Sequence, residues 1–139
     1  MLRLPLKSGG AEARPVEATL RAEPRRVLLV EDHADLAWSL EIVLRRMDHD
    51  VCRAATGAEA LAAAPWYEPD VALVDIGLPD MDGTEVTKCL RESLGTVLVI
   101  AAMSGFGQEA VRRRSLAAGC DHYLTKPVQR AQLRRLLGG

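Results

Sequence analysis

Five polar residues follow short apolar runs at four separate places in the sequence. They are the pair Glu31 and Asp32, then Asp75, Ser104 and Lys126. A charged group beside an apolar run is costly to desolvate unless a partner compensates it. If the three acidic residues gather in one place, charges about 4 Å apart repel by roughly 4 kcal/mol at an effective dielectric constant of about 20. A divalent metal ion is the simplest compensation.

The residue types also define the chemistry that such a metal site could support. All the candidate ligands are oxygen atoms, with no His or Cys from these strand ends, and oxygen ligands favour Mg²⁺ or Mn²⁺ over Zn²⁺ or Cu²⁺. Mg²⁺ is the expected physiological ion, and Mn²⁺ could substitute. The Ser104 hydroxyl and the Lys126 ammonium could surround a tetrahedral phosphoryl group together with the metal. The Asp75 carboxylate could then serve as the nucleophile.

Five short segments are the candidate strands that would position these residues. Three are apolar runs, Val27–Val30, Val71–Val74 and Val97–Ile100, and two are weaker, Asp50–Ala54 and Asp121–Thr125. They alternate with helical patterns, and parallel strands need helical crossovers. Runs too apolar to face water indicate a parallel sheet that helices cover on both faces. Such a sheet places ligands at the carboxyl ends of its strands, which is where the five polar residues stand.

Three features predict where helices lie. Apolar residues at helical spacing predict a first helix, and they are Leu36, Leu40, Val43, Leu44 and Met47. Thr56-Gly57-Ala58-Glu59 has the form of a capping box, so we expect a second helix to begin there and to stop at Pro65. Gly119 is expected to end the helix that carries Val111 and Leu116.

Four motifs stand in a fixed order along the chain. They are Val30-Glu31-Asp32, then Val74-Asp75-Ile76-Gly77-Leu78-Pro79-Asp80-Met81-Asp82-Gly83, then Ser104-Gly105, and finally Lys126-Pro127. In order and interval they resemble the response regulator receiver family of bacterial two-component systems, over roughly Arg25–Leu137. The resemblance implies an α/β, flavodoxin-like (βα)5 fold, whose five-stranded parallel sheet has the order 2-1-3-4-5 with helices on both faces. It also implies that the domain catalyses only its own phosphorylation and dephosphorylation.

The same resemblance assigns roles to individual residues. Asp75 would accept a phosphoryl group from a phosphohistidine on a histidine kinase or a histidine phosphotransfer protein. Mg²⁺ would be bound by Asp32, Asp75 and the carbonyl of Gly77, while Glu31 would bind it through water. Lys126 would pair with a phosphoryl oxygen.

The resemblance also implies a switch. Ser104 would hydrogen-bond the phosphoryl group and move on phosphorylation, and Tyr123, otherwise a half-buried strand aromatic, would change rotamer. The added charge would thereby alter the face around the fourth helix and the fifth strand. The peptide bond before Pro127 would be cis, which an X-Pro bond permits at low cost.

The chain departs from the commonest family pattern at two positions. Glu31 stands where the family frequently has Asp, and Ser104 stands where it frequently has Thr. Neither change removes a function that the site needs. Gly77 and Gly105 leave little side-chain bulk beside the acyl phosphate, so we expect a phosphoryl lifetime that is unremarkable or short.

Each candidate residue also has an ordinary structural interpretation. Taken alone, Asp75 would stabilise a turn, Ser104 would cap a helix or turn, and Lys126 would be an exposed cation. Their joint placement favours the site. For Asp80 and Asp82, which stand in a turn with Pro and Gly, turn and helix-cap roles are favoured over metal binding. The histidines are expected at the surface rather than as ligands or phosphoacceptors, and they are His33, His49 and His122.

Composition and charge disfavour several classes of protein. The formal net charge is −1, with 18 basic and 19 acidic residues, so no global field attracts nucleic acid or an anionic membrane. No apolar run approaches the roughly 18 to 20 residues that a membrane span needs. We therefore expect a cytoplasmic domain without direct membrane contact. The three cysteines lack C-x-x-C spacing and are expected to be reduced thiols.

The N-terminal residues indicate where the domain begins and what kind of protein it belongs to. Residues 1–24 are expected to form a flexible extension or interdomain linker, and residues 25–139 the receiver domain. Leu2-Arg3-Leu4-Pro5-Leu6 resembles the closing strand of a histidine kinase ATP-binding domain, which favours the receiver of a hybrid sensor histidine kinase. A stand-alone response regulator acting by protein contact and a silent docking receiver are the alternatives. A phosphohydrolase is disfavoured because such enzymes need a second Asp where this chain has Gly77.

Overall fold

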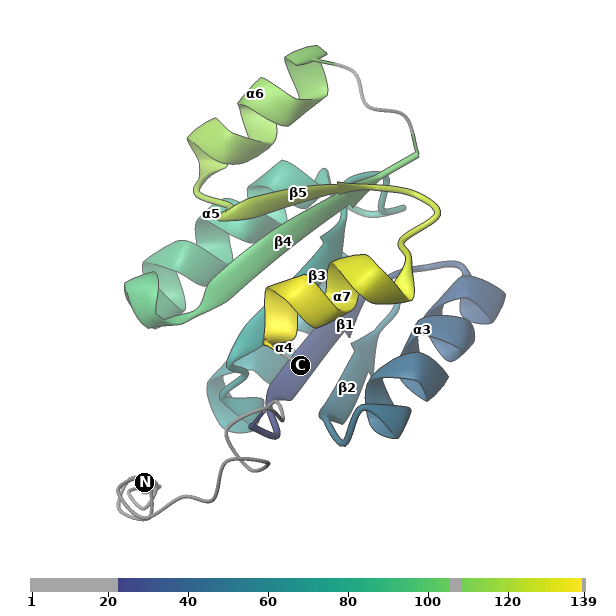
Figure 1. Ribbon diagram of the computed structural model, residues 1–139. Helices are drawn as coiled ribbons and strands as arrows, with labels where there is room; N and C mark the ends of the chain where they lie inside the picture. The colour runs from purple at the N-terminus through teal and green to yellow at the C-terminus, as the bar shows by residue number, and fades with distance from the viewer. Residues whose placement is uncertain (1–22, 106–108, 139) are drawn as a thin grey trace.

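The strands of the computed structural model, which describes residues 23–105 and 109–138, form one sheet in the order β2-β1-β3-β4-β5 (Figure 1). All of the strand pairs are parallel. The strands are β1 (Arg26–Val30), β2 (Asp50–Ala54), β3 (Val71–Asp75), β4 (Val99–Ser104) and β5 (His122–Thr125). The helices are α3 (Ala34–Arg46), α4 (Gly57–Tyr67), α5 (Gly83–Leu94), α6 (Glu109–Ala118) and α7 (Arg130–Leu137), with a 3₁₀ turn η2 (Gly95–Val97). The expected flavodoxin-like fold and its strand order are confirmed.

Helices cover both faces of the sheet, as parallel strands require (Figure 1). α3 and α7 pack on one face, while α4 and α5 pack on the other. α6 contacts α5 and β5 at one edge. Successive side chains of a strand point to opposite faces, so Leu28 and Val30 pack with α4 and α5, whereas Val27 and Leu29 pack with α3 and α7.

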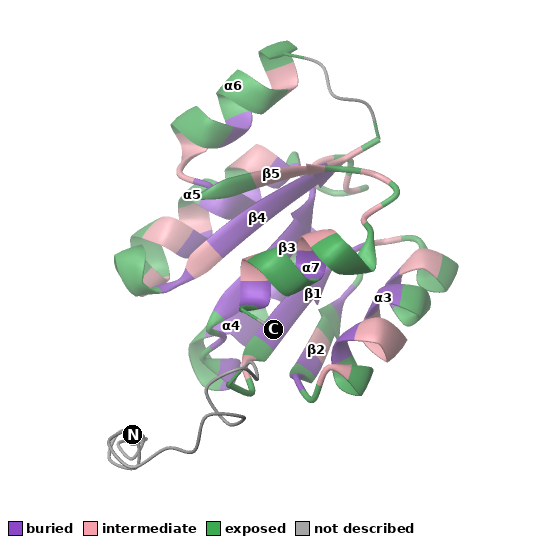
Figure 2. Ribbon diagram, in the orientation of Figure 1, coloured by how far each residue is buried: buried purple, intermediate pink, exposed green. Residues whose placement is uncertain are grey.

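Small aliphatic side chains make up most of the core, which Figure 2 shows as buried central strands between helices with exposed outer faces. Ala60 and Ala64 of α4 are buried, and their size lets this helix lie close to β1 and β2. On the other face, Leu40 and Leu44 of α3 are buried, as the helical spacing predicts. Full burial of one such Leu contributes roughly 1.5–3 kcal/mol.

The prediction that the second helix stops at Pro65 is wrong. The helix begins at Gly57 as predicted, because Thr56 Oγ1 accepts from the Glu59 N–H at 3.1 Å, but it continues to Tyr67. A proline inside a helix removes one backbone hydrogen bond and its ring crowds the carbonyl of the preceding turn, so other contacts must offset this cost. Burial of Tyr67 and its hydrogen bond to Asp50 Oδ2 at 2.7 Å stabilise the last turn beyond the proline.

The fourth strand begins later than the apolar run predicts. β4 starts at Val99, and Val97 lies in η2 with 89 % of its surface exposed. The Arg91 side chain explains the difference, because its Nη1 donates to the carbonyls of Gly95 at 2.8 Å and Leu98 at 2.6 Å. These bonds fix the chain in a turn just where the strand was expected. Gly119 ends α6 with φ +114°, as predicted.

The expected linker, residues 1–24, lies outside the described residues except for Glu23 and Pro24, and Leu2–Leu6 lies entirely outside them. Within the described part of the chain, every helix is too short or too polar to cross a membrane. The cysteines in this part are free thiols, namely Cys52, Cys89 and Cys120.

Candidate functional site

The carboxyl ends of four strands meet at one edge of the sheet and carry the predicted residues. Asp75 is the last residue of β3, and Ser104 is the last residue of β4. Ser104 is in register with Thr125 of β5, and its carbonyl accepts from the Lys126 N–H at 2.7 Å. Glu31 follows β1 directly. The fold therefore places these residues as the sequence predicts.

Lys126 is the centre of the site. Its ammonium lies 3.0 Å from Glu31 Oε1 and 3.1 Å from Asp75 Oδ1. The side chains of Glu31 and Asp75 are 0 % and 6 % exposed, whereas 19 % of the Lys126 side chain is exposed. Two buried carboxylates are thus bridged by one cation, which offsets part of their desolvation and repulsion.

The burial and the charges shift the pKa of both Asp75 and Lys126. Burial, and then the charge of Glu31, raise the pKa of Asp75, while Lys126 and the Gly77 N–H act in the opposite direction. Burial alone would lower the pKa of Lys126, but Glu31 and Asp75 outweigh burial and raise it. Lys126 is therefore charged at neutral pH, and the Asp75 carboxylate has a reduced preference for its ionised form.

A group of possible metal ligands lies beside the lysine. Glu31, Asp32, His33 and Asp75 each offer one ligand atom, and all of these atoms lie within 4.8 Å of one another. Asp32 Oδ1 is buried without a hydrogen-bond partner. A buried carboxylate oxygen with an unused lone pair fits a bound cation. The arrangement accordingly suits a divalent ion such as Mg²⁺.

One member of this group is a histidine, His33, which offers a nitrogen and which the sequence predicts as a surface residue rather than a ligand. His33 is exposed, as expected, yet its Nδ1 lies 3.3 Å from Glu31 Oε2 and 3.7 Å from Asp32 Oδ1. A nitrogen therefore lies among the oxygen atoms that the sequence predicts as ligands. The position of His33 directly after the acidic pair was the available signal.

The loop after Asp75 is held close to the strand. The Gly77 N–H donates to Asp75 Oδ1 at 3.2 Å, and the Gly83 N–H donates to the Ile76 carbonyl at 2.9 Å. A Cβ atom on Gly83 would lie only 2.4 Å from the Asp75 carbonyl oxygen. By contrast, a Cβ on Gly77 or Gly105 would meet nothing within 4 Å. Gly83 is therefore a positioning residue, and no local sequence pattern identifies it.

Asp80 and Asp82 have the turn and cap roles that the sequence predicts. Asp80 accepts from the N–H groups of Gly57 at 2.8 Å and Ala58 at 2.9 Å, at the start of α4. These bonds lower the pKa of Asp80. Asp82 is the N-cap of α5 and accepts from the Thr84 N–H at 2.8 Å.

The prediction that His49 lies at the surface is wrong. His49 is 3 % exposed, and its Nδ1 accepts from the Arg25 N–H at 3.0 Å. Burial, and then the charge of Arg25, lower the pKa of His49. The residue satisfies a backbone donor next to β1, a role that no local pattern reveals. His122 is exposed, as expected.

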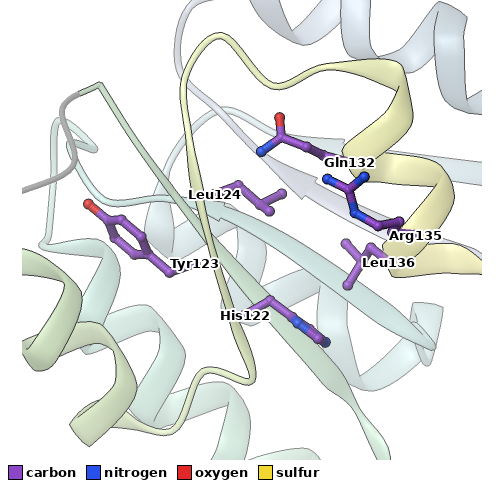
Figure 3. A pocket seen from close by; sticks show the side chains of 6 residues that line it. All are labelled: His122, Tyr123, Leu124, Gln132, Arg135 and Leu136. Atoms are coloured by element: carbon purple, nitrogen blue, oxygen red, sulfur yellow. The ribbon is translucent and has the colours of Figure 1, made fainter.

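Tyr123 is half-buried on β5 and packs against the core cluster of α4 and α5. The next residue, Leu124, packs against the opposite cluster. A pocket of about 390 Å³ lies between β5 and α7, lined by His122, Tyr123, Leu124, Gln132, Arg135 and Leu136 (Figure 3). Figure 3 shows the Tyr123 ring pointing away from Gln132 and Arg135. The Lys126–Pro127 peptide bond is cis, as the resemblance implies.

The strand order places the chain in the flavodoxin-like class of α/β proteins, and its candidate site residues stand at the carboxyl ends of the strands. A family model of the response regulator receiver domain matches residues 27–137. The chain therefore belongs to the response regulator receiver family of two-component signalling.

Relatives and solved structures agree with this family. The chain is 36 % identical over 110 residues to the cell cycle response regulator CtrA of Brucella ovis and of Brucella abortus. The match covers 78 % of this chain and 46 % of each relative, so the chain spans about half the length of these curated relatives.

Two solved structures illustrate the fold and a metal in it. The chemotaxis protein CheY4 of Vibrio cholerae matches with a TM-score of 0.78 at 27 % identity, over 84 % of this chain and 98 % of that one. The receiver domain of sensor histidine kinase PA1611 from Pseudomonas aeruginosa matches with a TM-score of 0.75 at 33 % identity, over 83 % and 95 % of the two chains. The latter has a magnesium ion coordinated in its active site cleft.

Proposed function

We propose that Asp75 accepts a phosphoryl group from a phosphohistidine on a histidine kinase or a histidine phosphotransfer protein. The observation that carries this proposal is the buried contact of Lys126 with both Glu31 and Asp75, at 3.0 and 3.1 Å. An Asp75 carboxylate oxygen attacks phosphorus, the bond from phosphorus to the donor imidazole nitrogen breaks, and that nitrogen takes up a proton. The product is an aspartyl phosphate.

The other residues of the site supply charge and hydrogen bonds during this transfer. Lys126 would pair with a phosphoryl oxygen once Asp75 is modified, and Ser104 would donate its hydroxyl hydrogen to another. Asp32, Asp75 and the Gly77 carbonyl would hold Mg²⁺, with Glu31 bound through water, and Mn²⁺ could substitute. A bound divalent ion supplies neutralisation of the charge that develops on the phosphoryl oxygens.

The readout that we propose is the face around α6 and β5. Phosphorylation adds nearly two negative charges at the end of β3. Ser104 and Tyr123 would carry that change to α6, whose one buried residue, among those described, is Ser115. A helix with so little buried surface shifts at low cost.

The context that we propose is a hybrid sensor histidine kinase, with residues 1–24 as the linker and 25–139 as the receiver. The likeness to the receiver domain of the sensor histidine kinase PA1611 supports this context. A stand-alone response regulator acting by protein contact, or a silent docking receiver, is the alternative. In either context we propose a cytoplasmic domain without nucleic-acid contact of its own. A genomic reading frame that begins at Met1 would contradict the hybrid context.

Intact mass spectrometry tests the central step. The protein is incubated with acetyl phosphate, with and without Mg²⁺, beside an Asp75→Asn variant and an Asp35→Asn control, whose carboxyl is exposed at the start of α3. We expect one added phosphoryl group in the wild type and the control, only with Mg²⁺, and none in Asp75→Asn. Absence of any addition under all conditions would favour the silent docking receiver.

The open space beside Gly77 and Gly105 supports a phosphoryl lifetime that is unremarkable or short. Without side chains at these positions, water reaches the acyl phosphate more easily. Timing the loss of label from phosphorylated protein tests this proposal, which a lifetime of many hours would contradict.

A further inference from the structure

His33 stands at the edge of the proposed metal site in a well-defined position. It is the N-cap residue of α3, in extended conformation, and its own side chain does not cap the helix. Its backbone N–H donates to Glu31 Oε2 at 3.2 Å, and its Nδ1 lies 3.3 Å from the same oxygen. The imidazole is thus directed at the carboxylates although 73 % of its side chain is exposed.

The distances fit ligands of a single ion. Two ligand atoms that each lie about 2.1 Å from an ion are roughly 3.0 Å apart at right angles and roughly 4.2 Å apart on opposite sides. His33 Nδ1 lies 3.3 Å from Glu31 Oε2 and 3.7 Å from Asp32 Oδ1, the oxygen that is buried without a hydrogen bond. An ion between the carboxylates could therefore include this nitrogen with only a small movement of an exposed ring.

We propose that His33 Nδ1 is a further ligand of the metal site and makes it selective for divalent ions of the transition series over Mg²⁺. The proposal rests on the proposed metal site at Asp32 and Asp75. Imidazole suits ions such as Ni²⁺ and Zn²⁺, whereas Mg²⁺ prefers oxygen ligands and keeps its water. Loss of the imidazole nitrogen should therefore weaken the binding of a transition ion and leave the binding of Mg²⁺ nearly unaffected.

Isothermal titration calorimetry of the full chain without an affinity tag tests the proposal. NiCl2 and MgCl2 are the probes, because both ions are small and octahedral but differ in their preference for nitrogen. The variants are His33→Ala and His33→Gln, with His122→Ala as the matched control, an exposed histidine on β5 that lies outside the acidic group. We expect His33→Ala and His33→Gln to weaken Ni²⁺ binding by roughly 10- to 100-fold and Mg²⁺ binding by less than about twofold. His122→Ala should change neither.

Competition identifies the site and separates the outcomes. Mg²⁺ in excess should raise the apparent Kd of Ni²⁺ for the wild type, and Asp32→Asn should weaken the binding of both ions. If Mg²⁺ binds but Ni²⁺ binds equally to wild type and His33→Ala, the role of His33 is overturned while the proposed function stands. If neither ion binds the wild type, the proposed metal site fails as well. The His33→Gln variant keeps a polar side chain but has no imidazole, so a loss of Ni²⁺ affinity in both variants reflects the missing imidazole nitrogen.

Discussion

At the scale of single residues, the site depends on one lysine between two buried acids. The Lys126 ammonium contacts Glu31 Oε1 and Asp75 Oδ1, and neither carboxylate has much access to water. In a buried ion pair, the Coulomb attraction between the charges roughly offsets the free energy lost when they leave water. If the lysine is removed, the two carboxylates keep their desolvation cost without the attraction that offset it. A phosphoryl oxygen arriving at Asp75 would find the same cation already in place.

The substitution Lys126→Met should therefore destabilise the metal-free protein. We expect a loss of about 2–4 kcal/mol in the free energy of unfolding, because Glu31 and Asp75 would remain buried without their counter-ion. Urea unfolding in EDTA measures this change, and Mg²⁺ should recover part of it. The exposed Lys88→Met on α5 is the control and should change stability by less than about 0.5 kcal/mol. Equal stability of Lys126→Met and wild type would show that the carboxylates need no counter-ion.

His49 should make the stability depend on pH. The pKa of His49 is lowered in the folded state, so the folded protein prefers the neutral ring more strongly than the unfolded chain does. The contribution of the neutral His49 ring to the free energy of unfolding is fully present above the pKa of the unfolded chain, about 6.5. This contribution is lost as the pH falls through the lower pKa that His49 has in the folded state. Urea unfolding between pH 5 and pH 8 should show this loss in the wild type and in His122→Gln. In His49→Gln this part of the pH dependence should be absent, and its persistence there would assign it to other groups.

At the scale of elements, the approach of α5 to the end of β3 sets the position of Asp75. Gly83, the first residue of α5, lies so close that an added Cβ would be 2.4 Å from the Asp75 carbonyl oxygen and 2.6 Å from Ile76 Cα. Backbone atoms cannot move aside as a flexible side chain can. The helix or the strand end would have to shift, and the carboxylate with it.

The pair Gly83→Ala and Gly77→Ala tests this contact. Gly83→Ala should lower the free energy of unfolding by about 1–3 kcal/mol through overpacking and should slow phosphorylation of Asp75 by acetyl phosphate. Gly77→Ala, in the same loop, meets open space and should leave stability nearly unchanged. Denaturant unfolding and intact mass over time are the measurements. Similar effects of both substitutions would mean that loop flexibility, rather than the close approach, is responsible.

At the scale of the whole molecule, a metal at the strand ends should stabilise the entire fold. The candidate ligands come from the segment that follows β1 and from the end of β3, which are joined only through the folded sheet. An ion that binds the folded state alone adds about 2.7 kcal/mol at a concentration of about 100 times its Kd. Because a small domain unfolds cooperatively, metal binding at the strand ends stabilises all five strands together.

Mg²⁺ should accordingly raise the Tm of the wild type by several degrees, and EDTA should reverse the increase. Asp32→Asn and Asp75→Asn remove ligands and should abolish most of the shift, while Asp35→Asn should retain it. Differential scanning calorimetry measures these values. A shift of the same size in Asp32→Asn would place the ion elsewhere on the molecule.

The sequence alone predicts five parallel strands and an acidic site at their carboxyl ends, although β4 begins at Val99 rather than at Val97. Apolar runs and helical spacing are local, so Leu40 and Leu44 could be assigned to the core, and the residues after each run could be assigned to one edge of the sheet. The resemblance added the strand order, and the sheet topology confirms it.

The distances between segments that are far apart in the chain follow from the packing of the folded protein and not from any local pattern. In the folded chain His49 accepts a hydrogen bond from the Arg25 N–H, and Gly83 packs against the Asp75 backbone. The Arg91 guanidinium donates to the Leu98 carbonyl and holds Val97 in a turn before the strand. The His33 ring likewise lies beside the carboxylates only in the folded chain. Burial of Tyr67 stabilises the turn of α4 that follows Pro65. These contacts depend on how helices and strands pack, and packing joins residues whose separation along the chain carries no periodic signal.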